Sequence, residues 1–87
     1  MNTERLLEFP CRFPIKAIGL ADADFRDRVA AIVAGHAADF DQQAVTVAPS
    51  RNGKYVSVTV VIEATSQAQL DAIYKELSAC EQVMMAL

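Results

Sequence analysis

The sequence predicts an α+β fold in which a four-stranded antiparallel sheet carries two helices on one face. Three observations support this. Apolar and polar residues alternate from Lys54 to Ala64, as is typical of a strand with one buried face. The Asn52-Gly53 pair just before this run is the strongest short-range signal of a hairpin. The remaining segments complete a β-α-β-β-α-β order, which is typical of the ferredoxin-like split βαβ arrangement.

Composition limits the chain to one small folded domain. Its 87 residues suffice for one core, and a hydrophobic content of 53% is too high for a disordered protein. The net charge of -3 disfavours nucleic acid as a partner. No apolar run approaches the roughly 20 residues of a membrane-spanning helix, and the N-terminus lacks a secretory signal. We therefore expect a cytoplasmic protein without a nucleic-acid or membrane partner.

The chain begins with a predicted leader of residues 1–10, and residues 11–87 form the single domain. The first strand is expected from Arg12 to Leu20, and Gly19 ends it in a turn or a close backbone approach. One face of this strand carries Phe13, Ile15 and Ala17, and the other carries Lys16 and Ile18. Pro14 is tolerable near the start of a strand.

The first helix is expected from Asp22 to about Ala37. Asp22 or Asp24 can cap it, because a short side-chain acceptor satisfies the free N–H groups of the first turn. Gly35 fits a helix close to its end. The inward stripe at helical spacing consists of Phe25, Val29, Ile32, Val33 and His36.

A second strand is expected from Gln43 to Pro49, with Val45 and Val47 on one face. The third strand follows the hairpin turn and separates two surfaces. Its core face carries Val56, Val58, Val60 and Ile62, and its outer face carries Tyr55, Ser57, Thr59, Val61 and Glu63.

The second helix starts at Ser66, where Ser66 and Gln69 form a capping-box pattern. Its apolar stripe consists of Leu70, Ile73, Tyr74 and Leu77. A short last strand is expected from Val83 to Leu87. Right-handed crossovers then give the strand order 4-1-3-2 and leave one face of the sheet open. They also place Cys11 and Cys80 at opposite ends, so we expect both thiols to be reduced.

Several segments also resemble a known family. The segments are Leu6–Cys11, Phe13–Lys16 with Gly19, Gly53–Val60 and the closing Val83–Leu87. In their order and spacing they are similar to the YbeD-like family of small bacterial proteins. The resemblance implies a ferredoxin-like fold similar to ACT-type regulatory domains, and it transfers no catalytic residue. ACT-type domains often bind small ligands near a glycine at the end of the first strand, a position that Gly19 matches.

Enzymatic and metal sites find little support in the residues. Cys11 and His36 are expected at the same end, where Glu8 or Asp39 could orient the imidazole of a cysteine nucleophile. A histidine that simply packs at a helix end is the favoured alternative. The loop of residues 19–24 has neither the cysteines of a copper carrier nor the arginine of an acyl-phosphate hydrolase. We expect no enzyme, no metal and no cofactor.

RNA binding on the sheet is also disfavoured. RNA-recognition domains stack bases on aromatic side chains of the central strands. Tyr55 is the only aromatic residue on the outer face of the third strand, and Ser57 and Thr59 follow it.

Two binding roles remain. A small-molecule effector could bind near the first strand-to-helix turn, where Gly19, Asp22, Arg51 and Lys54 are expected at one end. The preferred role is a regulatory or protein-interaction module that acts through its open sheet face or edge strands. This face is expected to carry Lys16, Ile18, Tyr55, Ser57, Thr59 and Val61, with Met84 or Met85 beside them. The expected partner is a second copy, as a homodimer, or another protein.

Overall fold

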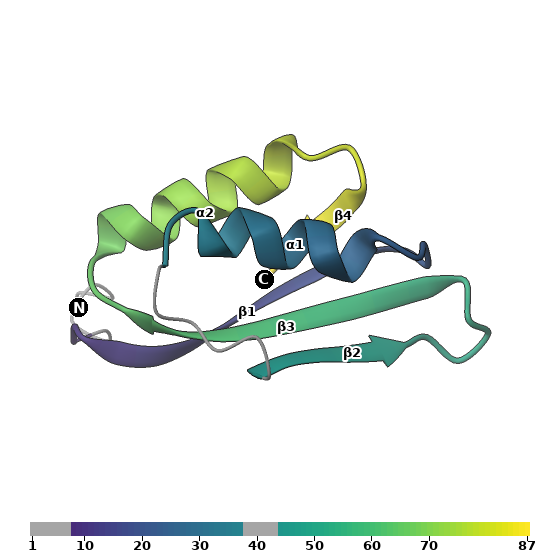
Figure 1. Ribbon diagram of the computed structural model, residues 1–87, viewed down its shortest axis with the longest axis horizontal. Coiled ribbons are helices and arrows are strands. Elements are labelled where there is room, and N and C mark those ends of the chain that lie inside the picture. Colours follow the sequence, from purple (N-terminus) through teal and green to yellow (C-terminus); the bar gives the residue numbers. More distant parts are fainter. Residues whose placement is uncertain (1–7, 38–43) are drawn as a thin grey trace, which may run out of the picture.

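A computed structural model describes residues 8–37 and 44–87 of the protein. Its elements are β1 (Cys11–Leu20), α1 (Phe25–Ala34), β2 (Val45–Pro49), β3 (Tyr55–Ala64), α2 (Gln67–Ala79) and β4 (Val83–Ala86). The strands form one antiparallel sheet in the order β2-β3-β1-β4, and both helices lie on one face of it (Figure 1). The predicted ferredoxin-like fold and strand order are therefore confirmed. The predicted start of the second strand, Gln43, lies outside the described residues.

The central feature of the sheet is the long ladder between β1 and β3. It runs without a break in register from the Cys11–Ala64 pair to the Leu20–Tyr55 pair. Side chains that are paired across strands lie on the same face of a sheet. Alternate residues of β3 from Val56 to Ala64 are buried under the helices, as the sequence pattern predicted.

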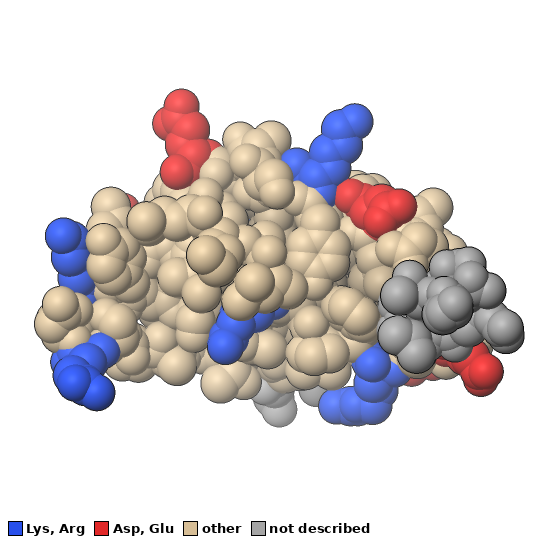
Figure 2. All heavy atoms as spheres, turned by 180° about the vertical axis from the view of Figure 1, so that it is seen from behind, with Lys and Arg blue, Asp and Glu red and all other residues tan. Residues whose placement is uncertain are grey.

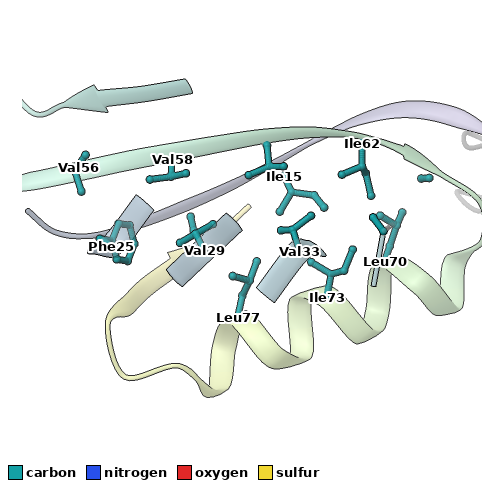
Figure 3. Packing of buried hydrophobic residues seen from close by; sticks show 14 residues of the cluster. Ile15, Phe25, Val29, Val33, Val56, Val58, Ile62, Leu70, Ile73 and Leu77 are labelled. Atoms are coloured by element: carbon teal, nitrogen blue, oxygen red, sulfur yellow. The ribbon is translucent and has the colours of Figure 1, made fainter. Parts of the chain in front are cut away.

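The core fills the space between the sheet and the helices (Figure 3). Phe25, Val29 and Val33 of α1 are at most 1% exposed, and α2 contributes Leu70, Ile73 and Leu77. Two members of the predicted α1 stripe are only half-buried. Ile32 packs against the edge of the core and lines the groove between the helices, and His36 faces Glu76 of α2.

The first helix begins three residues later than predicted. The N–H of Phe25 donates to the carbonyl of Asp22, and the N–H of Asp24 donates to the Asp22 carboxylate (3.3 Å). These bonds fold residues 22–25 into a turn. The helix therefore starts only at Phe25, whose ring enters the core.

The second helix begins where the capping pattern predicted. The N–H of Gln69 donates to the Ser66 hydroxyl (3.0 Å). The Gln69 side chain, however, accepts from the N–H of Thr65 (2.8 Å) and donates to the carbonyl of His36 (2.9 Å). It thereby joins the start of α2 to the chain just after α1.

The last strand covers only one half of β1. Lys16 and Leu87 exchange both backbone hydrogen bonds, at 3.1 and 2.8 Å, and the register shifts between Ile18 and Gly19. Backbone groups along a strand alternate in direction, so the nitrogen of Pro14 points the same way as that of Lys16. Pro14 therefore fits inside a central strand, because no described strand pairs with β1 at that point.

Candidate functional site

Exposed apolar side chains gather on the β4 side of the sheet. The large hydrophobic residues that are most exposed in the described part of the chain are Leu20, Val47, Met84, Met85 and Leu87. All except Val47 lie on β4, directly after it, or at the neighbouring end of β1. We call Leu20, Met84, Met85 and Leu87 the β4 patch; each is 53–60% exposed.

The sheet register explains why these four residues lie together. Met85 pairs with Ile18, and Leu87 pairs through its backbone with Lys16, so both side chains lie on the open face. Leu20 follows Ile18 on that face, and it lines a hollow of about 240 Å³ together with Met84. In Figure 1, β4 lies behind α1; the view from behind, Figure 2, is largely uncharged, with charged side chains mainly near its margin.

The structure places all six predicted open-face residues on one side of the sheet. Lys16 pairs with Thr59 and Ile18 pairs with Ser57, while Tyr55 pairs with Leu20 and Val61 pairs with Pro14. The β3 members are half-buried, whereas the β4 patch is more exposed. The apolar centre of the surface thus lies further toward β4 than expected. Of the two candidate methionines, Met85 is the one beside Ile18.

Leu20 and Leu87 were not singled out from the sequence. Leu20 could have been assigned to the open face, because it lies two residues after Ile18 and the side chains of a strand alternate between its faces. Leu87 could be placed only once its pairing with Lys16 was known.

Tyr55 contacts a basic side chain of the hairpin. The ammonium group of Lys54 lies 5.6 Å from the centre of its ring, a cation–π distance. The ring is half-buried besides. The ring thus has a contact within the protein.

The residues expected to hold a small effector do not converge on one cavity. A Cβ atom on Gly19 would meet the carbonyl oxygen of Gln82 at 2.3 Å and the Phe25 ring at 2.7 Å. Packing within the protein therefore requires this glycine. Lys54 turns its ammonium group toward the ring of Tyr55, and its carbonyl accepts from the N–H of Ala21 (2.9 Å).

Of the predicted effector residues, only Asp22 lines the hollow beside the turn. The other residues around it are Leu20, Glu81, Gln82 and Met84. Arg51 is exposed in the hairpin turn, where Asn52 accepts from the N–H of Lys54 (3.1 Å). The hollow therefore presents carboxylates, and basic groups do not line it.

His36 has a carboxylate partner that the sequence did not indicate. Its Nε2 lies 2.7 Å from a carboxylate oxygen of Glu76 on α2. No hydrogen bond in the described part of the chain joins His36 to Cys11, and Asp39 lies outside that part. Glu76 also borders a groove of about 680 Å³ between the helices, whose lining includes Arg28, Ile32 and Cys80. The imidazole thus links the turn after α1 to α2.

Residues 8–37 and 44–87 contain no cluster of three or more potential metal ligands. None of the helices within these ranges has the length and hydropathy needed to cross a membrane.

Comparison with known proteins identifies the family. The family described as "Protein of unknown function (DUF493)" matches residues 4–87. The chain belongs to this family. A UPF0250 protein of Nitrosomonas europaea is 45% identical over the whole of both chains. A UPF0250 protein of Neisseria gonorrhoeae is 38% identical, over 99% of this chain and 94% of the relative. The predicted relationship to the YbeD-like family is confirmed.

A solved structure shows the same fold. The solution structure of protein HP0495 from H. pylori has a TM-score of 0.68, covering 93% of this chain and 85% of that one. The sequences are only 16% identical, so this likeness bears on the fold alone.

Proposed function

We propose that this DUF493-family member is a protein-binding module and that the β4 patch is its contact surface. The observation that carries the proposal is the exposure of four neighbouring apolar residues on or beside β4: Leu20, Met84, Met85 and Leu87. The largest apolar patch on a typical monomer covers roughly 300–600 Å² and is often functional. Methionine is especially common at surfaces that adapt to protein partners, because its side chain is unbranched and polarisable.

The surroundings of the patch have the composition of an interface. Lys16 borders it on the open face, and Asp22 and Glu81 border it near the first turn. An apolar centre with a polar rim of both charges is typical of interfaces between proteins that also exist alone. About 800 Å² per partner is needed for a standard interface, so the open-face residues of β1 and β3 would supply the remainder.

The geometry gives less support to catalysis. The nucleophile that the sequence suggested, Cys11, has no hydrogen bond to His36, whose imidazole is held by Glu76. A cysteine nucleophile needs a base within hydrogen-bond reach. A role in binding therefore explains the described residues better than an enzymatic role does.

A comparative capture experiment tests the proposal. The protein is immobilised, and proteins retained from an extract of the source cells are quantified for the wild type, Met85→Glu and Ala68→Glu. Ala68 is the matched control, because it is an exposed, uncharged residue in the first turn of α2 and lies on neither edge strand. We expect a specific partner to bind the wild type and Ala68→Glu alike, and its binding to Met85→Glu to be at least about tenfold weaker.

The partner found in this way is then purified, and its affinity for the three proteins is measured by calorimetry. Equal affinity for wild type and Met85→Glu would overturn the proposal. So would a set of retained proteins that is the same for all three baits.

A small-molecule sensor is the second candidate, and the hollow beside the first turn is the observation that favours it. Because Asp22 and Glu81 line this hollow, it suits a small cationic metabolite better than a carboxylate. A thermal-shift screen of amines and amino acids would reveal it. Stabilisation that disappears in Glu81→Gln would support the sensor role, and no shift with any compound would count against it.

A further inference from the structure

The sheet has four stretches of strand edge without a neighbour in the described part of the chain. They are the outer side of β2, the outer side of β4, the part of β1 that extends beyond β4, and the part of β3 that extends beyond β2. A bare edge invites pairing with another chain. Natural proteins usually blunt such edges with proline, charged residues, irregular register or very short strands.

Three of the four edges carry these devices. The bare part of β1 contains Pro14, whose nitrogen faces outward without a hydrogen, and the charged Arg12. The bare part of β3, residues 61–64, contains the exposed, charged Glu63. The last strand has only 4 residues, and its pairing with β1 shifts register between Ile18 and Gly19. None of these three edges is a regular template for another strand.

The outer edge of β2 has almost none of these features that prevent strand pairing. The strand Val45–Pro49 contains no charged residue, and it pairs with β3 in unbroken register. The N–H of Ser50 donates to the carbonyl of Tyr55 (2.8 Å), so Ser50 faces β3. By alternation, the backbone groups of Val45, Val47 and Pro49 face outward. Pro49, at the end of the strand, is the only blunting feature.

The helices also leave β2 uncovered. Val47 pairs with the buried Val58, so its side chain is on the helix face, yet it remains 44% exposed. Figure 1 shows β2 at the margin of the sheet, beyond the helices, and Figure 3 shows it apart from the labelled core residues. Val45 is also only half-buried. Partly exposed apolar side chains, those of Val45 and Val47, therefore lie beside the bare edge.

We propose that β2 pairs in antiparallel fashion with β2 of a second copy, about a two-fold axis at Val47. In this register the two Val47 residues exchange N–H and carbonyl groups, and the N–H of each Val45 donates to the partner copy's Pro49 carbonyl. Every outward N–H of Val45–Pro49 then has an acceptor, and the proline, which cannot donate, is required only to accept.

The charge pattern favours a second copy as the occupant. Self-pairing of a strand sets each side chain opposite one of its own kind or near it, so any charge would oppose a like charge. Because this strand has none, self-pairing incurs no repulsion, and the exposed Val47 side chains cover each other on the helix face. The contact is small, below the roughly 1,200 Å² of stable complexes, so the dimer is weak and concentration-dependent.

Hydrogen exchange measured by NMR tests this pairing residue by residue. The amides of Thr46 and Ala48 face β3 and are protected at every protein concentration. The amides of Val45 and Val47 exchange freely at about 10 µM and become at least about tenfold protected near 1 mM, where light scattering gives twice the 9.5 kDa mass of the chain. A 9.5 kDa mass and unprotected Val45 and Val47 amides at about 1 mM would overturn the proposal.

Two proline variants separate pairing from folding. Val47→Pro removes an outward N–H, so we expect a folded protein that stays monomeric. Ala48→Pro removes an N–H that faces β3, so it should lower the thermal midpoint of the monomer. If Val47→Pro unfolds the protein, Val47→Lys provides the same test, because it places like charges opposite each other in the dimer while leaving the backbone intact.

The Met85→Glu variant tests whether dimerisation depends on the β4 patch. Met85 lies on the edge strand opposite β2, so this variant should dimerise as the wild type does. Dimerisation that is lost in Met85→Glu but retained in Val47→Lys would assign self-association to the β4 patch and overturn the β2 pairing.

Discussion

Gly19 is the residue at which β1, α1 and the loop before β4 approach most closely. The carbonyl of Gln82 and the ring of Phe25 occupy the space that a side chain at this position would need. The strand therefore passes under the helix at a distance that only glycine allows. This packing role gives a sufficient reason for a glycine here, without a ligand.

We predict that Gly19→Ala lowers the free energy of unfolding by about 1–3 kcal/mol, as overpacking of a tight site does. Gly35→Ala is the control, because this residue has ordinary helical backbone angles and the nearest atom to an added Cβ lies at 3.4 Å. Urea denaturation of both variants checks the difference. Equal stability of the two variants would contradict this prediction, because it would show that the loop before β4 moves at little cost to make room for the added methyl group.

Asp24, just before α1, is joined to the loop before β4 by a hydrogen bond to its carboxylate. Its pKa is lowered from the usual value of 3.8, chiefly because the Gln82 side chain donates a hydrogen bond to its carboxylate (3.3 Å). A carboxyl group whose pKa is lower in the folded state stabilises the fold above its unfolded pKa. That contribution is lost as the pH falls through the folded pKa.

We therefore predict that Asp24→Asn destabilises the protein at neutral pH and that the difference from the wild type shrinks as the pH falls below 3.8. NMR titration of the Asp24 carboxyl group gives the direct measurement. Its pKa should rise in Gln82→Ala. A wild-type pKa at or above 3.8 would contradict the assignment of this hydrogen bond.

At the scale of elements, the sequence pattern predicted a strand well where burial and hydrogen bonding both repeat every two residues. The alternation in residues 54–64 predicted β3 to within one residue, because the same period sets its core face and its ladder. The predicted start of α1 was wrong. Aspartate is a favoured capping residue, but the Asp24 side chain makes no cap hydrogen bond, and the choice between turn and helix at Asp22 depends on how Phe25 packs.

Contacts between elements could not be predicted from local sequence patterns. Glu76 lies 40 residues from His36, and their pairing depends on how two helices align. The β4 patch could be inferred only in part. One methionine beside Ile18 follows from strand parity, as Leu20 does, whereas Leu87 joins the patch through its specific pairing with Lys16.

The junction between the helices gives a prediction at this scale. Ser66→Ala removes the cap of α2 and should cost about 1 kcal/mol. Gln69→Ala should cost about 1–2 kcal/mol, because it leaves both the Thr65 N–H and the His36 carbonyl without this partner. Gln67→Ala, which removes only an exposed hydrogen bond to Asp71, is the control and should change little. Thermal denaturation ranks the three variants, and a Gln69→Ala midpoint equal to that of Gln67→Ala would refute the junction.

At the scale of the whole molecule, the two proposed surfaces lie at opposite edges of one sheet. A dimer joined through β2 would therefore carry a β4 patch at each end, free to bind. Two linked sites raise the apparent affinity for a partner that is itself dimeric or immobilised. Val47→Lys should therefore weaken binding to an immobilised partner while leaving its affinity for a monomeric partner unchanged, as surface plasmon resonance in both orientations would show. An equal affinity of wild type and Val47→Lys for the immobilised partner would argue against two-site binding.

The long β1–β3 ladder also determines how this chain reaches its fold. Its pairs join residues as far apart as Cys11 and Ala64, so the chain must close a long loop before its largest set of contacts forms. We expect folding in milliseconds to seconds, with the ladder present in the transition state and β2 joining later. In stopped-flow experiments, Val58→Ala should chiefly slow folding, whereas Val45→Ala should chiefly speed unfolding; the reverse would make the β2–β3 hairpin the nucleus. Until β2 docks, the forming sheet would expose the edge of β3, and it is in this interval that the protein is most open to pairing with a wrong strand.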